Sequence, residues 1–184
     1  MCGICGFTGP ADTPALNRMI ESLRHRGPNG SGVWEGESIS LGMTRLAIID
    51  IKSGQQPVFN EEKTLCAVFN GEIYNHIELR RDLEKKGHKF YSDHADSEVI
   101  VHLYEEYGLD FLEKLNGMFA IALWDSRQKE LILARDRIGI KPLYFSKTPS
   151  GVVFGSEPKA ILSHPSVSRE PNLIALHHYF TFKN

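Results

Sequence analysis

The stretch MCGICGFTG, residues 1–9, places one cysteine directly after Met1 and a second three positions later. Apolar and small residues surround both thiols, which is typical of a buried β-strand. Three interpretations compete: a metal-binding or redox pair, a buried structural cysteine, or a nucleophile that works only at a chain terminus. The rest of the sequence has to distinguish them.

The metal and redox interpretations find little support. A structural zinc site normally needs a second ligand pair at similar spacing, and the third cysteine, Cys66, stands alone. The eight histidines form no HExxH or CxxC…HxxxH pattern. We therefore expect no metal and no cofactor in this domain.

Position separates Cys5 from Cys2. Cys5 has the apolar neighbours Ile4 and Phe7 and is interpreted as a packing residue. Once Met1 is removed, Cys2 carries a free α-amine, a group whose ordinary pKa is about 7.7–8.0. Cys2 would then supply both a nucleophile and a proton acceptor that works near neutral pH.

Length and charge indicate one ordinary soluble domain. The chain has 184 residues, a net charge of −2 and 41% apolar residues. There is no basic block or basic helical face, so we expect no nucleic acid and no anionic membrane as partner. No apolar run is long enough to span a bilayer, no signal peptide is evident, and the odd number of cysteines is typical of a reducing compartment, which predicts a cytoplasmic protein.

The periodicity predicts helices over residues 14–25, from Asn75 to Gly87, and around 99–107. Strands are expected at LGMTRLAIIDI, TLCAVF, MFAIALWD, ELILA, PLYF and GVVF, which are rich in branched and aromatic residues. Because the strands come in runs, we expect an α+β fold of antiparallel sheets covered by helices.

Several polar residues are candidates for a site. Arg45 lies in an otherwise apolar stretch and needs an anion, which is either a structural partner such as Asp50 or a substrate carboxylate. Asn70-Gly71 is typical of a tight hairpin, yet a helix follows almost at once; an amide beside a glycine N–H can instead stabilise an oxyanion. Asp96 alone would be interpreted as a helix cap.

Taken together, these segments resemble the class II glutamine amidotransferases, and among them the glutaminase domains of the asparagine synthetases. The resemblance covers nearly the whole chain through the motifs Cys2-Gly3-Ile4, RHRGPNGSG, TRLAIID, GQQP, FNGEIYNH, DSEVI, LNGMFAIALWD, ARDRIGIKPLY and SEPKAI. It implies an N-terminal nucleophile hydrolase fold, a four-layer αββα sandwich of two antiparallel sheets between helical layers. It also implies that Cys2 is the terminal nucleophile.

The resemblance further implies hydrolysis of L-glutamine to glutamate and ammonia. Cys2 would attack the side-chain carboxamide and form a thioester, while Asn70 and the Gly71 N–H hold the oxyanion. Arg45 would bind the substrate α-carboxylate. The α-ammonium group of the glutamine would be bound by Asp96, Glu72 and the backbone near Ile48.

The resemblance also implies a missing half. The sequence has no P-loop and no SGGxDS-like pyrophosphate loop, so the synthetase domain that would bind ATP and aspartate is absent. We expect residues 1–171 to form the glutaminase domain and 172–184, an amphipathic segment crowded with apolar residues, to begin an interface segment towards that domain. A homodimer is compatible with this segment.

Two further expectations complete the interpretation. The charged strip from Arg135 to Lys141 is interpreted as a solvated or salt-bridged turn without a catalytic role. A binding module with an idle cysteine is the rival function. Asn29 stands where this family commonly has aspartate, which affects the charge of that loop.

Overall fold

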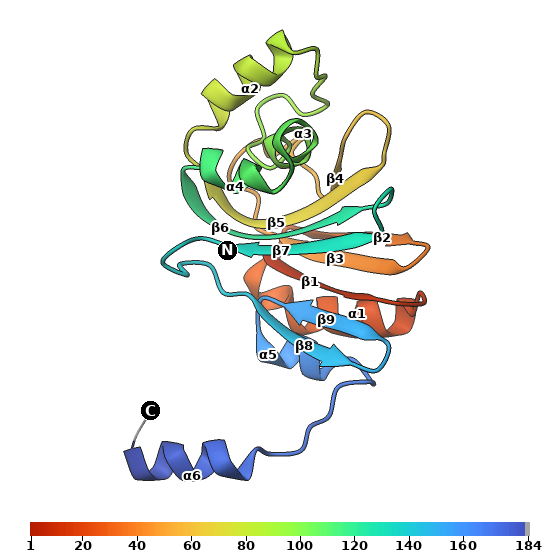
Figure 1. Ribbon diagram of the computed structural model, residues 1–184, viewed down its shortest axis with the longest axis vertical. Helices are drawn as coiled ribbons and strands as arrows, with labels where there is room; N and C mark the ends of the chain where they lie inside the picture. Colours follow the sequence, from red (N-terminus) through yellow and green to blue (C-terminus); the bar gives the residue numbers. More distant parts are fainter. Residues whose placement is uncertain (183–184) are drawn as a thin grey trace.

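The computed structural model describes residues 1–182 and consists of two antiparallel sheets stacked between helices (Figure 1). The first sheet has the order β2 (Gly30–Gly36), β3 (Ile39–Arg45), β1 (Gly3–Thr8), β9 (Gly151–Gly155), β8 (Tyr144–Thr148). The second has the order β4 (Val58–Phe59), β5 (Leu65–Ile73), β6 (Gly117–Asp125), β7 (Glu130–Arg135). This confirms the predicted four-layer αββα sandwich.

Helices cover the outer face of each sheet (Figure 1). Helices α1 (Thr13–Ser22) and α5 (Pro158–Leu162) lie on the first sheet, and α2 (His76–Lys85), α3 (Val99–Tyr107) and α4 (Phe111–Lys114) lie on the second. Two 3₁₀ turns, Arg24–Arg26 and Gly108–Asp110, follow α1 and α3. Asp12 caps α1, its carboxylate accepting the Ala15 N–H at 2.9 Å.

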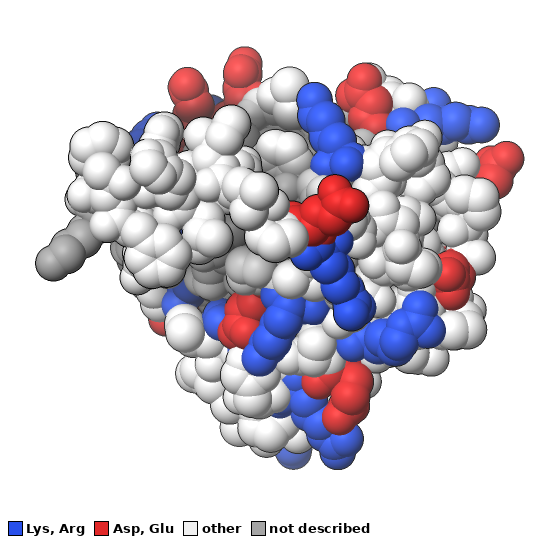
Figure 2. Space-filling model, turned by 90° about the horizontal axis from the view of Figure 1, so that it is seen from below, with Lys and Arg blue, Asp and Glu red and all other residues white. Residues whose placement is uncertain are grey.

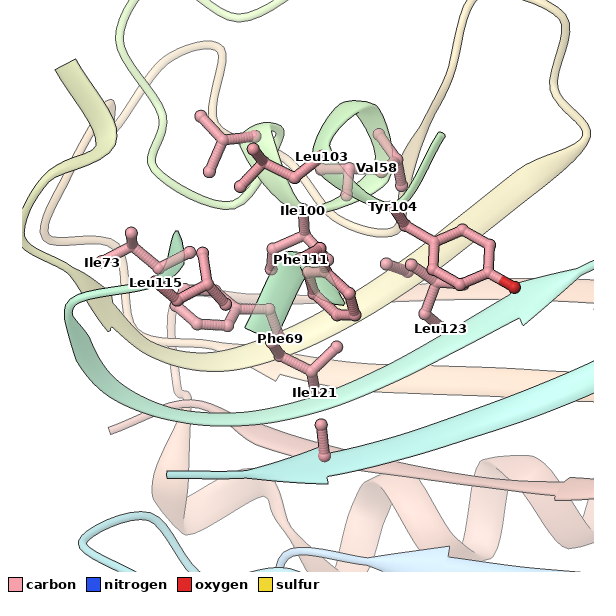
Figure 3. Close-up of a cluster of buried hydrophobic side chains, with 14 of the residues drawn as sticks. Val58, Phe69, Ile73, Ile100, Leu103, Tyr104, Phe111, Leu115, Ile121 and Leu123 are labelled. Carbon is pink, nitrogen blue, oxygen red and sulfur yellow. The ribbon is translucent and has the colours of Figure 1, made fainter. Parts of the chain in front are cut away.

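Three apolar cores separate the four layers. Phe69 and Ile121 of the second sheet pack against Ile100 and Leu103 of α3 and Phe111 of α4 (Figure 3). A second core fills the space between the sheets, and a third joins β1 and β9 to α1 and α5. The alternation of β1 decides which core each residue joins, since Ile4 faces the other sheet whereas Cys5 and Phe7 face α1.

The elements expected from the sequence differ from those of the structure at several points. The strand expected over residues 41–51 ends at Arg45, and residues 46–57 form an irregular loop. Strand β2 was not predicted, because its GSGVWEG sequence is rich in glycine and mostly solvent-facing. The short helices α4 and α5 were also missed, since they are too short to show a helical period.

Helix α6 (Leu173–Phe182) extends away from the sandwich (Figure 1), and none of its residues is buried. Seen from below, it presents an uncharged surface, whereas charges of both signs mix over the rest of this face (Figure 2). In the part of the chain that the structure describes, no helix has both the length and the hydropathy needed to cross a membrane.

Candidate active site

The candidate active site lies at one end of the sandwich. In each strand, every second side chain faces the space between the two sheets, and at this end these inward-facing side chains change from apolar to polar. In β3 the row Ile39, Leu41, Met43 continues to Arg45, and in β5 the row Cys66, Val68 continues to Asn70. In the first sheet, Cys2 immediately precedes β1 and lies two residues before Ile4, on the same face. Because successive side chains of a strand point to opposite faces, Cys2, Arg45 and Asn70 all face the space between the sheets at the same end of the sandwich.

One pocket at this end is lined by all seven residues that the sequence singled out: Cys2, Arg45, Ile48, Asn70, Gly71, Glu72 and Asp96. Met1, Gln56, Ser97, Met118 and Lys141 are among the other residues that line it. The structure therefore brings together residues from both sheets and from the segment before α3. Asp96 is not the cap of that helix, since Glu98 occupies the N-cap position.

The Cys2 thiol is half-buried. The backbone of Cys2 is held in place by a hydrogen bond from Arg26. Arg26 donates through Nε to the Cys2 carbonyl oxygen at 3.0 Å and through Nη1 to Glu157 Oε1 at 2.8 Å. Burial alone would raise the pKa of Glu157, but hydrogen bonds from Arg26 and His25 outweigh it and lower the pKa to about 2. This ion pair anchors the start of β1 next to the pocket.

The thiol itself contacts the first residue of the loop that follows β3. Cys2 Sγ lies 3.4 Å from the Leu46 backbone nitrogen and 3.7 Å from the Leu46 carbonyl oxygen. The other two thiols are buried, and burial raises the pKa of both Cys5 and Cys66. Cys2 is therefore the only one of the three thiols that is both accessible and in the pocket.

Asn70 and Gly71 do not form a hairpin; β5 continues through both residues in register with β6. A Cβ at Gly71 would lie 2.1 Å from the Met118 carbonyl oxygen, so only glycine fits. The Asn70 side chain is buried, and its Nδ2 has no hydrogen-bond partner among the described residues. A buried amide donor left unpaired in a pocket is costly unless a ligand accepts from it.

Arg45 is buried and its guanidinium does not pair with the Asp50 carboxylate. It donates instead to the carbonyl oxygens of Asp50 at 2.6 Å, Ile51 at 3.1 Å and Ile49 at 3.5 Å. Since a guanidinium has five N–H groups, these contacts leave donors for a further anion. Arg45 thereby shapes the loop wall and keeps a positive charge at the pocket.

The Asp50 carboxylate has its own partners. It accepts hydrogen bonds from the Ser53 N–H and hydroxyl and, at 3.0 Å, from the His94 N–H. Burial would raise its pKa, but these hydrogen bonds outweigh burial and hold the pKa well below its usual range. Asp50 therefore ties the 46–54 loop to the segment that carries Asp96.

Two carboxylates give the pocket a negative side. Asp96 Oδ2 accepts the Ile73 N–H at 3.0 Å, and burial nevertheless raises the pKa of Asp96, with the charge of Glu72 adding to the effect. Burial disfavours the charged form of this carboxylate, and a cation that binds beside it stabilises that charged form. Asp96 and Glu72 together thus suit an ammonium group.

Sequence reasoning missed Lys141. The strip from Arg135 to Lys141 is a turn in which Arg135, Arg137 and Ile138 are exposed, as expected of a solvated turn, but Asp136 and Lys141 are buried. The Asp136 carboxylate accepts the N–H groups of Phe119, Ile140 and Lys141 at 2.8–3.2 Å. Arg135 Nε donates to the Lys141 carbonyl oxygen at 2.6 Å. The resulting loop brings the Lys141 side chain, 7% exposed, to the pocket. Nothing in the local sequence distinguishes Lys141 from an ordinary exposed lysine of a loop, so its place in the pocket could not be predicted.

Asn29 also has a defined place near this loop. Its Oδ1 accepts the Ala47 N–H at 3.1 Å, and its own N–H donates to the Arg45 carbonyl oxygen at 3.0 Å. The carboxamide oxygen accepts the hydrogen bond that a carboxylate oxygen could accept there. Asn29 makes this contact without bringing a negative charge to the loop.

The fold is that of known amidotransferases. Glutamine phosphoribosylpyrophosphate amidotransferase from Bacillus subtilis superposes with a TM-score of 0.71 at 22% identity, over 88% of this chain and 43% of that one. A structure described as the allosteric regulatory enzyme of purine biosynthesis gives a TM-score of 0.75 at 24% identity, with the same coverage. At these identities the likeness establishes the fold alone.

The sequence establishes the family. Residues 1–184 match the model of the glutamine amidotransferase domain, and the chain belongs to this family. Similar curated proteins include asparagine synthetase [glutamine-hydrolyzing] 3 of Bacillus subtilis, 39% identical over 98% of this chain, and asparagine synthetase [glutamine-hydrolyzing] 2 of Oryza sativa subsp. japonica, 50% identical over 88%. The chain spans 30% and 28% of their lengths.

Proposed function

We propose that this domain hydrolyses L-glutamine to glutamate and ammonia through a thioester on Cys2. The α-amine of Cys2 takes the thiol proton, and the resulting thiolate attacks the side-chain carboxamide carbon. Collapse of the tetrahedral intermediate breaks the C–N bond, the amine returns a proton, and ammonia leaves. Water then attacks the thioester and releases glutamate. The reaction needs no cofactor.

One observation carries this proposal: Asn70, whose buried Nδ2 has no partner among the described residues, lines the same pocket as Cys2. An oxyanion hole needs donors that are fixed in place before charge develops. Asn70 and Gly71 lie in a strand paired along its whole length with β6, so neither has to reorganise during the reaction.

The charges of the pocket support an α-amino acid as substrate. Arg45 supplies a cation for an α-carboxylate, and Asp96 with Glu72 supplies anions for an α-ammonium. An amino acid held at both charged groups would direct its side chain towards Cys2. A free amide without these groups should be a poor substrate.

The destination of the ammonia lies outside this chain. We infer that it is passed to an asparagine synthetase-type domain, as the names of the longer relatives suggest. The family resemblance implies that such a domain uses ATP and aspartate. The wholly exposed helix α6 supports a contact with such a domain, since Leu173, Ile174 and Phe180 are each more than 70% exposed. We also propose residues 1–171 as the glutaminase domain and the cytoplasm as its location.

Glutamine hydrolysis by the chain without Met1 tests the proposal, with Asn70→Ala as the diagnostic variant. Loss of one oxyanion donor typically lowers kcat by about 10²–10³-fold, so we expect a loss of this size with little change in KM. Asn17→Ala, on the exposed face of α1, is the control. Absence of glutamine turnover in the parent chain, or full kcat in a folded Asn70→Ala variant, would contradict the proposal.

Arg45→Lys tests the substrate carboxylate site. Lysine keeps the charge but loses the forked geometry, and a charge-assisted hydrogen bond contributes about 1.5–3 kcal/mol. We therefore expect KM for glutamine to rise at least about tenfold. Arg24→Lys, at an exposed position, should leave KM unchanged. A lower melting temperature with unaltered kinetics would instead assign Arg45 only to the support of residues 49–51.

A further inference from the structure

A second cluster of chemically active side chains lies on the helical side of the second sheet, away from the Cys2 pocket. It consists of Glu61 in the turn between β4 and β5, His88 after α2, and His102 and Glu105 on α3. Residues 102 and 105 are three apart and share one helix face. One donor atom from each of the four residues lies within 4.8 Å of every other, and none of the four residues lines the Cys2 pocket.

His102 is the unusual member. Its side chain is fully buried, and within residues 1–182 neither ring nitrogen has a hydrogen-bond partner. Its Nδ1 lies 3.4 Å from Glu61 Oε2, and its ring contacts Phe90. A buried imidazole without a hydrogen bond needs an explanation, and metal ligation provides one.

The other three side chains of the cluster are oriented by neighbouring groups that do not belong to it. His88 Nε2 lies 3.2 Å from Glu106 Oε1, and its other ring nitrogen, Nδ1, lies 3.3 Å from Glu61 Oε1. The Lys89 N–H donates to Glu61 at 2.8 Å. Asn60 Nδ2 donates to Glu105 Oε1 at 3.2 Å. Such second partners are typical of metal-ligating histidines and carboxylates.

The spacing suits a tetrahedral ion. With ligand bonds of about 2.0–2.2 Å, a tetrahedral zinc ion holds its ligand atoms about 3.3–3.6 Å apart. In the structure, Glu61 Oε1 lies 3.3 Å from His88 Nδ1 and Glu61 Oε2 lies 3.4 Å from His102 Nδ1, close to these values. Glu105 Oε2 lies 4.0 Å from His88 Nδ1, so the Glu105 side chain would have to move closer on binding. Two carboxylates also neutralise the charge of a divalent cation.

We propose that Glu61, His88, His102 and Glu105 bind a divalent transition-metal ion of the zinc type. The ion joins the β4–β5 turn, the segment after α2 and helix α3, and so stabilises the outer face of the second sheet. The sequence predicted no metal because the ligands come from three separate segments and follow no local motif. Only the fold places them together.

The test is calorimetric titration of the metal-stripped full chain with zinc ions alone. We expect one ion per chain and a rise in melting temperature on binding. His88→Asn and Glu105→Gln should each weaken binding at least tenfold and abolish the thermal shift. The matched controls His94→Asn and Glu62→Gln remove an exposed histidine and an exposed glutamate outside the cluster and should bind as the parent does.

A parallel titration with cobalt ions identifies the ligand type, because thiolate ligands add a sulfur-to-metal charge-transfer band. We expect the spectrum of a four-coordinate ion without this band. The proposal is overturned if no saturable one-to-one binding occurs, if both His88→Asn and Glu105→Gln bind zinc as tightly as the parent, or if the ion is held through Cys2. His102→Asn is avoided because its site is in the core.

Discussion

Cys2→Ala should abolish glutamine turnover, lowering kcat by at least about 10⁴-fold, because alanine can form no thioester. The pocket should otherwise persist, since Arg26 holds residue 2 through its backbone carbonyl and not through the thiol. Glutamine should therefore still bind to the variant. Glutamate release by coupled assay, together with calorimetric binding of glutamine, separates the two effects.

Cys5→Ala is the matched control, because Cys5 is the other cysteine of the same N-terminal segment but points towards α1. It should keep most of the activity while losing some stability from the buried site. A glutamine-like electrophile such as a diazoketone analogue should label Cys2 alone, as located by mass spectrometry. An adduct on Cys5 or Cys66, or activity in Cys2→Ala, would refute the nucleophile assignment.

Most of the longer strands were predictable because their side chains alternate between cores, whereas β2 and β4 were not predicted. Residues 118–125 and 130–134 have the branched and aromatic composition of strands and lie in β6 and β7. The same alternation explains the clustering of the site, since Arg45 and Asn70 each follow apolar residues at a spacing of two. The spacing of two that places Arg45 and Asn70 on the same face as these apolar residues can be read directly from the sequence.

The loop after β3 was not predictable in the same way. LAIIDI has the composition of a strand, yet Ile48 and Ile51 are 71% and 67% exposed. Arg45 takes the carbonyl oxygens of residues 49–51 as hydrogen-bond acceptors, and the Asp50 side chain binds Ser53 and His94. These side-chain contacts, most of them between residues three to six positions apart and one reaching His94, outweigh local β-propensity.

Lys141 and the Glu61–His102 cluster were missed for a related reason. The position of Lys141 depends on Asp136, whose carboxylate accepts backbone N–H groups from β6 and from its own loop. The cluster depends on the packing of α3 over β4 and β5. In both cases the residue type was visible in the sequence, but its neighbours are set by tertiary structure.

Retention of Met1 should inactivate the domain almost as fully as loss of the thiol. With Met1 attached, the nitrogen of Cys2 is an amide and cannot accept a proton, and loss of a general base costs about 10²–10⁴-fold in rate. Met1 also lines the pocket itself, where the substrate side chain has to enter. The two effects act on different parameters, since the first lowers kcat and the second raises KM.

Two preparations that differ only at the terminus measure this effect. A cleavable leader is removed either directly before Cys2 or directly before Met1, and intact mass verifies each product. Aminopeptidase treatment of the Met1 form should restore activity, which excludes misfolding as the cause, and Met1 is 56% exposed to such treatment. In the Cys2 form, kcat/KM should rise with pH through the range of a free α-amine, about 7.7–8.0, because only the neutral amine accepts a proton. Equal turnover by the two forms would show that the terminal amine is not the base.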